Sequence, residues 1–298
     1  MGYRQVYIKK AKKLSFKDNQ LVITRDEESN NVPLEDINFI ILDSYETIIT
    51  ARLLTELSKH YICLIVCDEF HEPKTITYSY NHHYKQLEVL ETQLLATESF
   101  NDILWKKIIE FKIKNQLCLI NELESNNEEA IKKLSDYLNE VEIGDITNRE
   151  GLASKIYFRA LFGHNFIRFY DDAINMALNY GYTILKSAIT RSLVAHGLLP
   201  YLGIHHKSKT NNFNLAYDLI EPYRPIIDKY VYQNMERLTT PLSFEIRKEL
   251  IDLLNEQVLI NNKFYTVQFS IDVVVQSYIK SLEENKNNLL LPSLITKK

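Results

Sequence analysis

Three positions in the second half of the chain carry side chains suited to metal-assisted chemistry. Glu150 lies in "ITNREGLASKIYFRALFG", His205 and His206 lie in "GIHH", and Glu221 lies in "DLIEPYRP". Two carboxylates brought together in a cleft repel each other, so one takes up a proton unless a divalent cation lies between them. A neutral imidazole completes such a donor set, which suits Mg²⁺ or Mn²⁺ and attack on a phosphodiester.

Each of these residues also has a plainer structural explanation. A Thr-Asn pair just before Glu150 can cap a helix, which places this acid in a first turn, where it opposes the helix dipole. Glu221 can form a surface ion pair with Arg224 at a capped helix end. Adjacent histidines on an extended chain point to opposite sides, so at most one faces a given site. Asp218 shares a helical face with Glu221, and spacing alone leaves open whether Glu150 and Glu221 meet.

Basic residues gather near the same segments. If they contact a phosphate backbone, binding should weaken steeply as salt rises; an ordinary solvated surface is the alternative. Trp105 lies among apolar helical positions and is predicted to pack in the core rather than to stack on bases. The basic candidates are Lys186, Arg191, Lys207, Lys209 and Arg224.

Length and composition indicate an ordinary soluble protein with one large domain or two smaller ones. Its 298 residues are 45% hydrophobic and 25% charged, which suffices for a core. The net charge of −4 argues against a uniformly basic coat, although a local basic face is compatible with it. Cys63, Cys67 and Cys118 form neither a disulfide framework nor a zinc pair. The start lacks a signal-peptide core and no run approaches about 18 apolar residues, so we expect a cytoplasmic protein without a membrane partner.

The first part of the chain has the pattern of short strands. Apolar and polar residues alternate in "RQVYIKK", "KLSFKDNQLVITRD" and "NNVPLEDINFIILD", with a hairpin turn at Asp18 and Asn19. Residues 46–60 have helical spacing, and "YICLIVCD" predicts a buried strand. Together these elements predict a β-rich domain over residues 1–75.

Beyond this domain the spacing of apolar residues becomes helical, as in "YKQLEVLETQLLA", "NDILWKKIIEFKIKNQLCLINEL" and "NEEAIKKLSDYLNEV". We therefore predict an α+β protein, with a linker over residues 76–88 and a larger α-helical catalytic domain over residues 89–298. The histidines of "HEP" and "NHHY" have no acidic or cysteine companions at metal spacing and are interpreted as linker residues. The tail, residues 285–298, is expected to fray.

Four motifs occur in an order that resembles the CRISPR adaptation integrase family, the "Cas one" endonucleases, and its type II members in particular. They are "REGLASKIYF", "DDAINMALNYGYTIL", "HGLLPYLGIHH" and "FNLAYDLIEPYRP". The likeness runs over nearly the full chain and includes the strands "KLSFKDNQLVI" and "ICLIVCD". In that family a β-domain precedes an α-helical domain, which agrees with the fold predicted from the residues. The family also uses "NYGY" for packing.

The resemblance implies a metal site and assigns its residues. The family's glutamate, histidine and second acid fall on Glu150 of "REGLA", His206 of "GIHH" and Glu221 of "DLIEP". Counting a "G-x-x-H" element from its glycine selects His206 rather than His205, and Asp218 is the next candidate for the second acid. The implied cofactor is Mg²⁺ or Mn²⁺.

The resemblance further implies spacer acquisition. The 3′-hydroxyl of a captured double-stranded DNA fragment would attack a phosphodiester at the CRISPR repeat. The implied partners are a second copy of this chain, bound through the β-domain, and a small "Cas two" dimer in a heterohexamer. In type II systems the effector nuclease and a ring-shaped DNA-end-binding protein are further partners. A non-catalytic architectural DNA-binding subunit and a branched-DNA repair nuclease are the alternatives.

Overall fold

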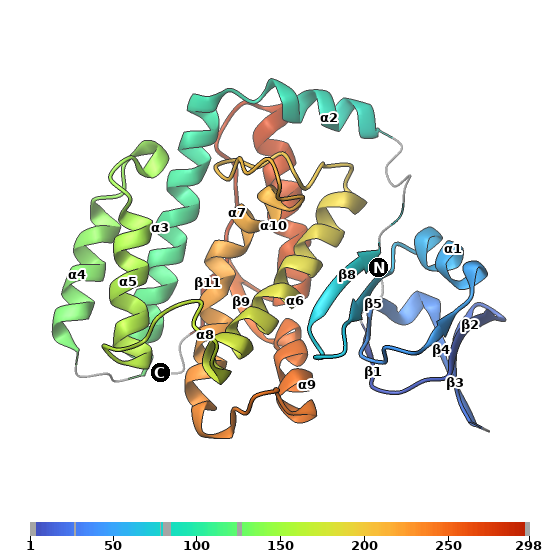
Figure 1. Ribbon diagram of the computed structural model, residues 1–298. Coiled ribbons are helices and arrows are strands. Elements are labelled where there is room, and N and C mark those ends of the chain that lie inside the picture. The colour runs from blue at the N-terminus through green and yellow to red at the C-terminus, as the bar shows by residue number, and fades with distance from the viewer. Residues whose placement is uncertain (1–3, 27, 78, 80–84, 124–126, 296–298) are drawn as a thin grey trace. The chain divides into compact units, whose positions relative to one another are not determined.

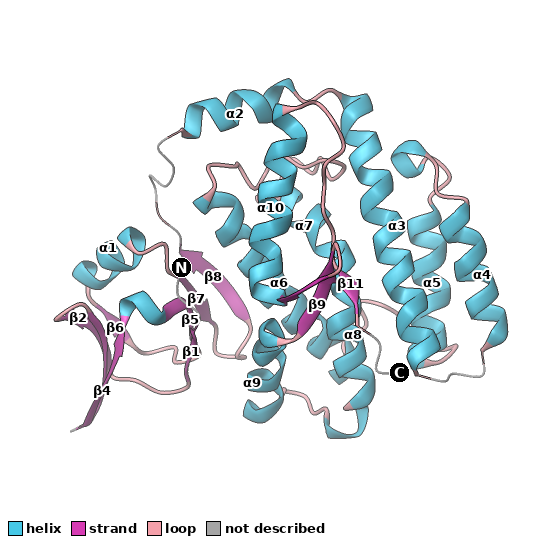
Figure 2. Cartoon of the chain, turned by 180° about the vertical axis from the view of Figure 1, so that it is seen from behind, coloured by secondary structure: helices cyan, strands magenta, loops and turns pink. Residues whose placement is uncertain are grey.

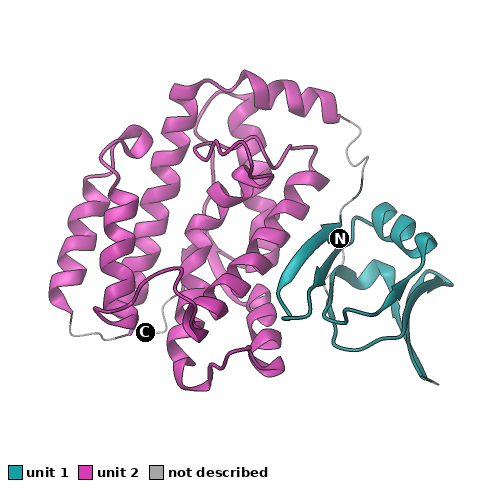
Figure 3. Ribbon diagram, viewed as in Figure 1, with its two compact units in different colours: residues 1–84 teal, residues 85–298 magenta. Residues whose placement is uncertain are grey.

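The computed structural model of the protein divides into two compact units, Met1–Tyr84 and Lys85–Lys298 (Figure 3). The first unit is rich in strands and the second is mostly helical, which confirms the predicted α+β fold. The structure describes residues 4–26, 28–77, 79, 85–123 and 127–295.

The described part of the N-terminal unit contains two four-stranded sheets and one α-helix (Figure 1). Its elements are β1 (Arg4–Ile8), β2 (Lys13–Lys17), β3 (Gln20–Arg25), β4 (Glu28–Pro33), η1 (Leu34–Asp36), β5 (Ile37–Leu42), β6 (Ile48–Ile49), α1 (Ala51–Lys59), β7 (Cys63–Cys67) and β8 (Pro73–Thr77). The strand orders are β1-β5-β7-β8 and β4-β3-β2-β6. All six residues of β5 are buried, as suits a strand with a neighbour on each side.

The hairpin turn predicted in this unit is confirmed. Asp18 and Asn19 join β2 to β3 with φ angles of 49° and 60°, the left-handed conformation of a two-residue hairpin turn. The predicted third strand is divided, because the 3-10 turn η1 separates β4 from β5. The predicted linker over residues 76–88 overlaps regular structure at both ends, since β8 continues to Thr77 and the helix α2 begins at Gln86. His82 and His83 of that linker lie outside the described residues.

The described part of the C-terminal unit is a helical assembly with one small sheet (Figure 2). Among the described residues, no helix combines the length and the apolar character needed to cross a membrane. The elements are α2 (Gln86–Leu95), α3 (Glu98–Glu122), α4 (Glu128–Asn139), η2 (Ile143–Asp145), α5 (Arg149–Phe162), α6 (Ala173–Ala195), α7 (Asn214–Ile220), η3 (Glu221–Tyr223), α8 (Arg224–Gln233), η4 (Met235–Arg237), α9 (Phe244–Asp252), η5 (Leu253–Asn255), β9 (Gln257–Ile260), β10 (Lys263–Thr266), α10 (Val267–Glu283) and β11 (Ser293–Leu294).

The long helix α3 connects two groups of helices in this unit. It packs against α4 and α5, which lie beside it in Figures 1 and 2, and also against α7, η3 and α8. Its buried face carries Ile108 and Ile109 and, three residues further on, Lys112. Lysine is rarely buried unless it has a charged partner. This position therefore marks a place where α3 meets acidic residues.

The glycine of "NYGY" permits the close approach of α6 to α8. A Cβ atom on Gly181 would lie 2.5 Å from Cγ2 of Ile227, well inside van der Waals contact. Any larger residue at position 181 would therefore separate the two helices. The next residue, Tyr182, points from α6 toward Asp228 on α8, so this close approach also sets the geometry of the candidate site.

The expectation that the C-terminal tail frays is wrong for its described part. Leu289 and Leu291 are buried, and β11 pairs with β9 in a three-stranded sheet of order β10-β9-β11 (Figure 2). Apolar side chains and the strand pairing hold this segment against the helices. The burial of Leu289 and Leu291 therefore outweighs the polar run "NKNN" that precedes them.

Candidate active site

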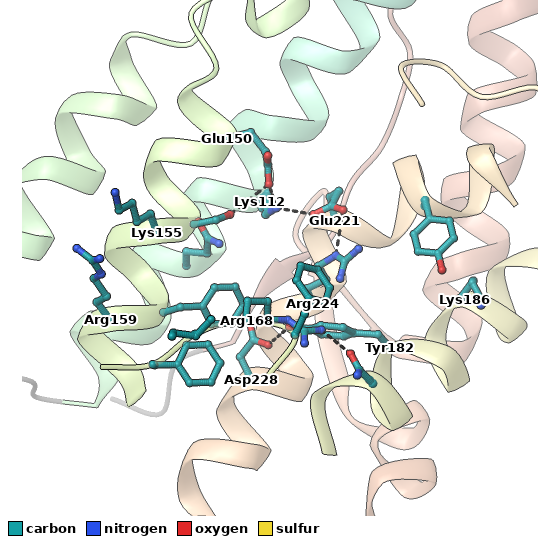
Figure 4. A pocket seen from close by; sticks show the side chains of 18 of the residues that line it. Lys112, Glu150, Lys155, Arg159, Arg168, Tyr182, Lys186, Glu221, Arg224 and Asp228 are labelled. Atoms are coloured by element: carbon teal, nitrogen blue, oxygen red, sulfur yellow. Dashed lines mark hydrogen bonds and ion pairs between the residues drawn. The ribbon is translucent and has the colours of Figure 1, made fainter. Parts of the chain in front are cut away.

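A pocket of about 820 Å³ in the helical unit brings the two predicted glutamates together (Figure 4). Glu150 comes from the first turn of α5 and Glu221 from η3, and both point toward the buried Lys112 of α3. Basic residues also line the pocket, namely Lys155, Arg159, Arg168, Lys186 and Arg224.

Lys112 forms ion pairs with both glutamates. Its Nζ donates to Oε1 of Glu150 and lies 2.6 Å from Oε2 of Glu221. Only 6% of the side chain of Lys112 and 6% of that of Glu221 are exposed. Burial alone would lower the pKa of Lys112, but the two carboxylates outweigh it and raise the pKa. The charge of Lys112 in turn lowers the pKa of Glu150, so this lysine and this glutamate stabilise each other's charged form.

Hydrogen bonds to the backbone fix the position of Glu150. The side chain of Asn148 caps α5 by accepting from the N–H of Gly151, which confirms that Glu150 lies in a first helical turn. The buried carboxylate of Asp145 accepts from the N–H groups of Arg149 and Glu150, at 2.8 and 3.0 Å. The predicted cap and the predicted position of the acid are therefore both correct.

Asn115, which follows Lys112 on the next turn of α3, fixes the segment that carries Glu221. Its Nδ2 donates to the carbonyl oxygens of Pro222, at 2.8 Å, and Pro292, at 3.0 Å. Its Oδ1 accepts from the N–H of Leu294, at 3.1 Å. One buried amide thus joins α3, η3 and the C-terminal strand.

Arg224 and a buried tyrosine–aspartate cluster form another wall of the pocket. Nε of Arg224 donates to Oε1 of Glu221 at 3.0 Å, so the predicted ion pair exists but is largely buried rather than on the surface. The guanidinium lies over the ring of Tyr182, 4.5 Å from its centroid. The hydroxyls of Tyr182 and Tyr157 donate to the two oxygens of Asp228. Burial raises the pKa of Asp228 to about 6.

The histidine side of the candidate site is organised by Asp218. This fully buried carboxylate accepts from the backbone N–H groups of Ile204, His205 and His206, at 2.6, 3.1 and 3.1 Å. Its Oδ1 also lies 2.6 Å from Nδ1 of His206. The hydrogen bond of its imidazole to Asp218 raises the pKa of His206, and the charge of Glu221 adds to this. Since Asp218 already has four partners, it holds the imidazole instead of competing with Glu221 as a ligand.

His205 and His206 occupy different environments. His205 stacks on Trp105, with ring centroids 4.3 Å apart and planes at 2°, and burial lowers its pKa. His206 meets the same indole edge-on. Trp105 is only 4% exposed, which confirms its predicted place in the core. The imidazole of His206 with Asp218 behind it has the arrangement common among metal-binding histidines, in which Nδ1 contacts a carboxylate and Nε2 is the donor atom.

The structure brings together two of the three predicted ligands. Glu150 and Glu221 meet at Lys112, whereas His206 lines a second pocket of about 630 Å³. Among the residues that the structure describes, no three His, Cys, Asp or Glu side chains form a ready metal-binding group. The ammonium of Lys112 lies between the carboxylates, where a cation is electrostatically favoured. Two converging carboxylates and an oriented imidazole are nevertheless a donor set that fits Mg²⁺ or Mn²⁺.

The basic residues predicted to contact DNA have four different settings. Lys186 lines the first pocket, near the rings of Phe213 and Tyr217. Lys207 and Lys209 line the second pocket, and Lys207 pairs with Glu98 at an exposed position. Arg224 is engaged with Glu221. Arg191 is only 6% exposed within α6, so its burial does not fit a direct contact with DNA.

Sequence reasoning missed Lys112 and three basic residues of the pocket, Lys155, Arg159 and Arg168. A lysine on the apolar face of a predicted helix is a signal that could have selected Lys112. Lys155 and Arg159 lie four residues apart on α5, so helical spacing could have placed them on one face together. They follow Glu150 by five and nine residues, which puts them on a different face of the helix from that acid.

Solved structures identify the fold. A casposase bound to an integration product superposes with a TM-score of 0.76 at 21% identity, covering 96% of this chain and 92% of that chain. A Cas6-RT-Cas1–Cas2 complex gives a TM-score of 0.77 at 18% identity, covering 99% of this chain and 36% of that chain. The fold is therefore that of Cas1 proteins and casposases.

Sequence comparison then gives the family. The family model for CRISPR associated protein Cas1 matches residues 6–262. The CRISPR-associated endonuclease Cas1 of Neisseria meningitidis serogroup C is 39% identical over 298 residues, covering 99% of this chain and 97% of the relative. This chain belongs to the Cas1 family, as its motifs indicated.

Proposed function

We propose that this chain is a DNA integrase and endonuclease of CRISPR adaptation. It joins the 3′-hydroxyl of a captured DNA fragment to a phosphodiester at the border of a CRISPR repeat. Membership of the Cas1 family supports this function. The single structural observation that carries it is the convergence of Glu150 and Glu221, two acids 71 positions apart, on one buried cation.

Glu150, Glu221 and Nε2 of His206 would hold Mg²⁺ or Mn²⁺. Such an ion, when bound, polarises the phosphoryl oxygen and lowers the pKa of the attacking hydroxyl. The chain's own residues prepare the site for it. Asp145 fixes the start of α5 below Glu150, Asn115 fixes the turn that carries Glu221, and Asp218 orients the imidazole.

Basic residues of the pocket would bind the DNA backbone. Lys155 and Arg159 are exposed on α5, and Lys186 lies near the rings of Phe213 and Tyr217 on the other side of the pocket (Figure 4). Lys207 and Lys209 extend this basic character beyond His206. We assign Arg224 to orienting Glu221 instead, and we leave Arg191 out of the DNA surface because it is buried.

The proposed partners are double-stranded DNA and Cas2. The fold shared with Cas1–Cas2 complexes and with a DNA-bound casposase supports both. In the complete assembly, two homodimers formed through the β-rich domain, residues 1–75, would flank a Cas2 dimer. The type II effector nuclease and a ring-shaped DNA-end-binding protein would act as accessory partners.

A strand-transfer assay with purified Cas2 and a repeat-bearing plasmid tests the proposal. We expect activity with Mg²⁺ or Mn²⁺, and Glu221→Gln should lower its rate by about 10³-fold or more, because the ion loses a charged ligand. Glu236→Gln, at an exposed position, is the matched control. Strand transfer that survives in Glu221→Gln, with normal DNA binding, contradicts a catalytic role and indicates an architectural subunit. Integration that needs no Cas2 would favour a repair nuclease.

A further inference from the structure

Two acids and two bases form a closed charge cluster in the pocket wall. Lys112 contacts both Glu150 and Glu221, and Arg224 contacts the other carboxylate oxygen of Glu221. The formal charges of these four groups sum to zero. The two glutamates proposed as metal ligands are therefore already neutralised by the protein's own cations.

Burial makes this neutralisation effective. The side chains of Lys112 and Glu221 are 6% exposed, and that of Arg224 is 20% exposed. Charges in such surroundings interact much more strongly than charges in water, because little solvent screens them. A divalent ion that enters this cluster would have to draw both carboxylates from Lys112 while it is repelled by two nearby cations. The DNA-free protein should consequently bind a divalent ion only weakly.

DNA changes this balance. The pocket is lined by cations that suit phosphate groups, among them Lys155, Arg168 and Lys186. Each phosphate that reaches the pocket adds a negative charge close to the cluster, which offsets the repulsion of an entering ion. Lys112 also lines the pocket, so its ammonium group, once released from the glutamates, can turn toward a phosphate oxygen.

We propose that Lys112 is an internal counter-ion that prevents the two glutamates from binding a divalent ion until DNA is bound. Metal and DNA then bind with positive cooperativity, and by linkage each raises the affinity for the other by the same factor. This inference rests on the proposed function, since it assumes that Glu150 and Glu221 are metal ligands. It assigns to Lys112 a positioning role that restricts metal loading to the DNA-bound protein.

Mn²⁺ binding, measured from the electron paramagnetic resonance signal of the free ion, tests this proposal. The full-length chain is titrated with and without a short duplex whose 3′ ends are dideoxy, so that no strand transfer occurs. Glu221→Gln with the same duplex corrects for ions held by the DNA itself. We expect the duplex to raise the Mn²⁺ affinity of the unaltered protein by about tenfold or more.

Lys112→Met should reverse this behaviour. Without DNA it should bind Mn²⁺ about tenfold more tightly than the unaltered protein, and the duplex should then add little. Without metal its melting temperature should be lower, because the buried Glu221 and the partly buried Glu150 lose their counter-ion, and Mn²⁺ should restore it. Lys114→Met removes the same charge from an exposed position on the same helix and should change neither affinity nor melting temperature.

The outcomes separate this inference from the proposed function. It is overturned if the unaltered protein binds Mn²⁺ equally well with and without the duplex, or if folded Lys112→Met binds it no more tightly. In both cases the metal site itself survives. If no protein binds more Mn²⁺ than Glu221→Gln under either condition, the metal site fails as well. Should Lys112→Met not fold, the effect of the duplex on the unaltered protein decides alone.

Discussion

The glutamate side and the histidine side of the candidate site are held by different forces. Glu150 and Glu221 are held by a side-chain cation, Lys112, whereas His206 and its loop are held by backbone N–H groups that all donate to Asp218. A side-chain cation can be exchanged for another cation, but a loop bonded through its backbone keeps one conformation. Loading an ion should therefore rearrange the glutamate side and leave the histidine side in place.

The largest expected effect comes from removing the support of the histidine side. Asp218→Ala leaves three N–H groups and an imidazole without their buried acceptor, and should lower the free energy of unfolding by about 3–5 kcal/mol. If the variant is folded at low temperature, its Mn²⁺ affinity in the DNA complex should fall by about 10–100-fold, because His206 loses its orientation. Urea denaturation and Mn²⁺ titration measure the two effects.

Asp252→Ala, at an exposed position near the end of α9, is the control and should change the unfolding free energy by less than about 0.5 kcal/mol. If Asp218→Ala folds and binds Mn²⁺ with unaltered affinity, Asp218 does not fix His206 for metal binding. The proposed difference between the histidine side and the glutamate side would then be wrong.

A smaller, pH-dependent effect on the free energy of unfolding is expected from Asp228, which lies in the wall of the same pocket as the two glutamates. Burial raises the pKa of Asp228 to about 6, from an ordinary value near 4, so the folded protein holds this proton more tightly than the unfolded chain does. Between about pH 4 and pH 6 the unfolded chain binds fewer protons, and stability falls as pH rises. Relative to Asp228→Asn, the protein should lose about 2–3 kcal/mol of unfolding free energy over this interval.

Urea denaturation of both proteins at four pH values between 4 and 7 measures this difference. If the unfolding free energies of the unaltered protein and of Asp228→Asn change in parallel with pH, the pKa of Asp228 is not raised. The hydroxyls of Tyr157 and Tyr182 would then keep its carboxylate charged.

The smallest effect should come from the exposed lysines next to the histidine side. Lys207→Ala combined with Lys209→Ala should weaken DNA binding and make the slope of log affinity against log salt shallower by about 2, because each lysine would neutralise one phosphate. Thermal stability should stay the same, because the ion pair of Lys207 with Glu98 is exposed. Fluorescence anisotropy over a salt series measures the slope, with Lys280→Ala and Lys286→Ala as controls. An unchanged slope places both lysines outside the DNA footprint.

Local patterns in the sequence predicted most of the fold. The alternation of the first strands, the turn at Asp18 and Asn19, and the first-turn position of Glu150 all depend on neighbours within a few residues. The C-terminal strand β11 was missed because its partner β9 lies more than 30 residues earlier, and a two-residue strand has no periodicity of its own.

The candidate site was predictable only in part. Motif resemblance selected Glu150, Glu221 and His206. Helical spacing could have placed Lys112 on the apolar face of its helix, but it does not show which acids Lys112 meets. Its partners lie 38 and 109 positions away, so its role follows from helix packing and burial, not from spacing. The same holds for Asp218, whose function depends on the path of the loop that it binds.

The three hydrogen bonds of Asn115 have a consequence for synthesis of the protein. The turn behind Glu221 is secured by an amide that also needs Pro292 and Leu294. On the ribosome, a nascent chain lacks both partners until residues 292–294 leave the exit tunnel. The acid-bearing turn therefore reaches its finished form only after the rest of the helical unit has been made, and a shorter nascent chain carries an incomplete site.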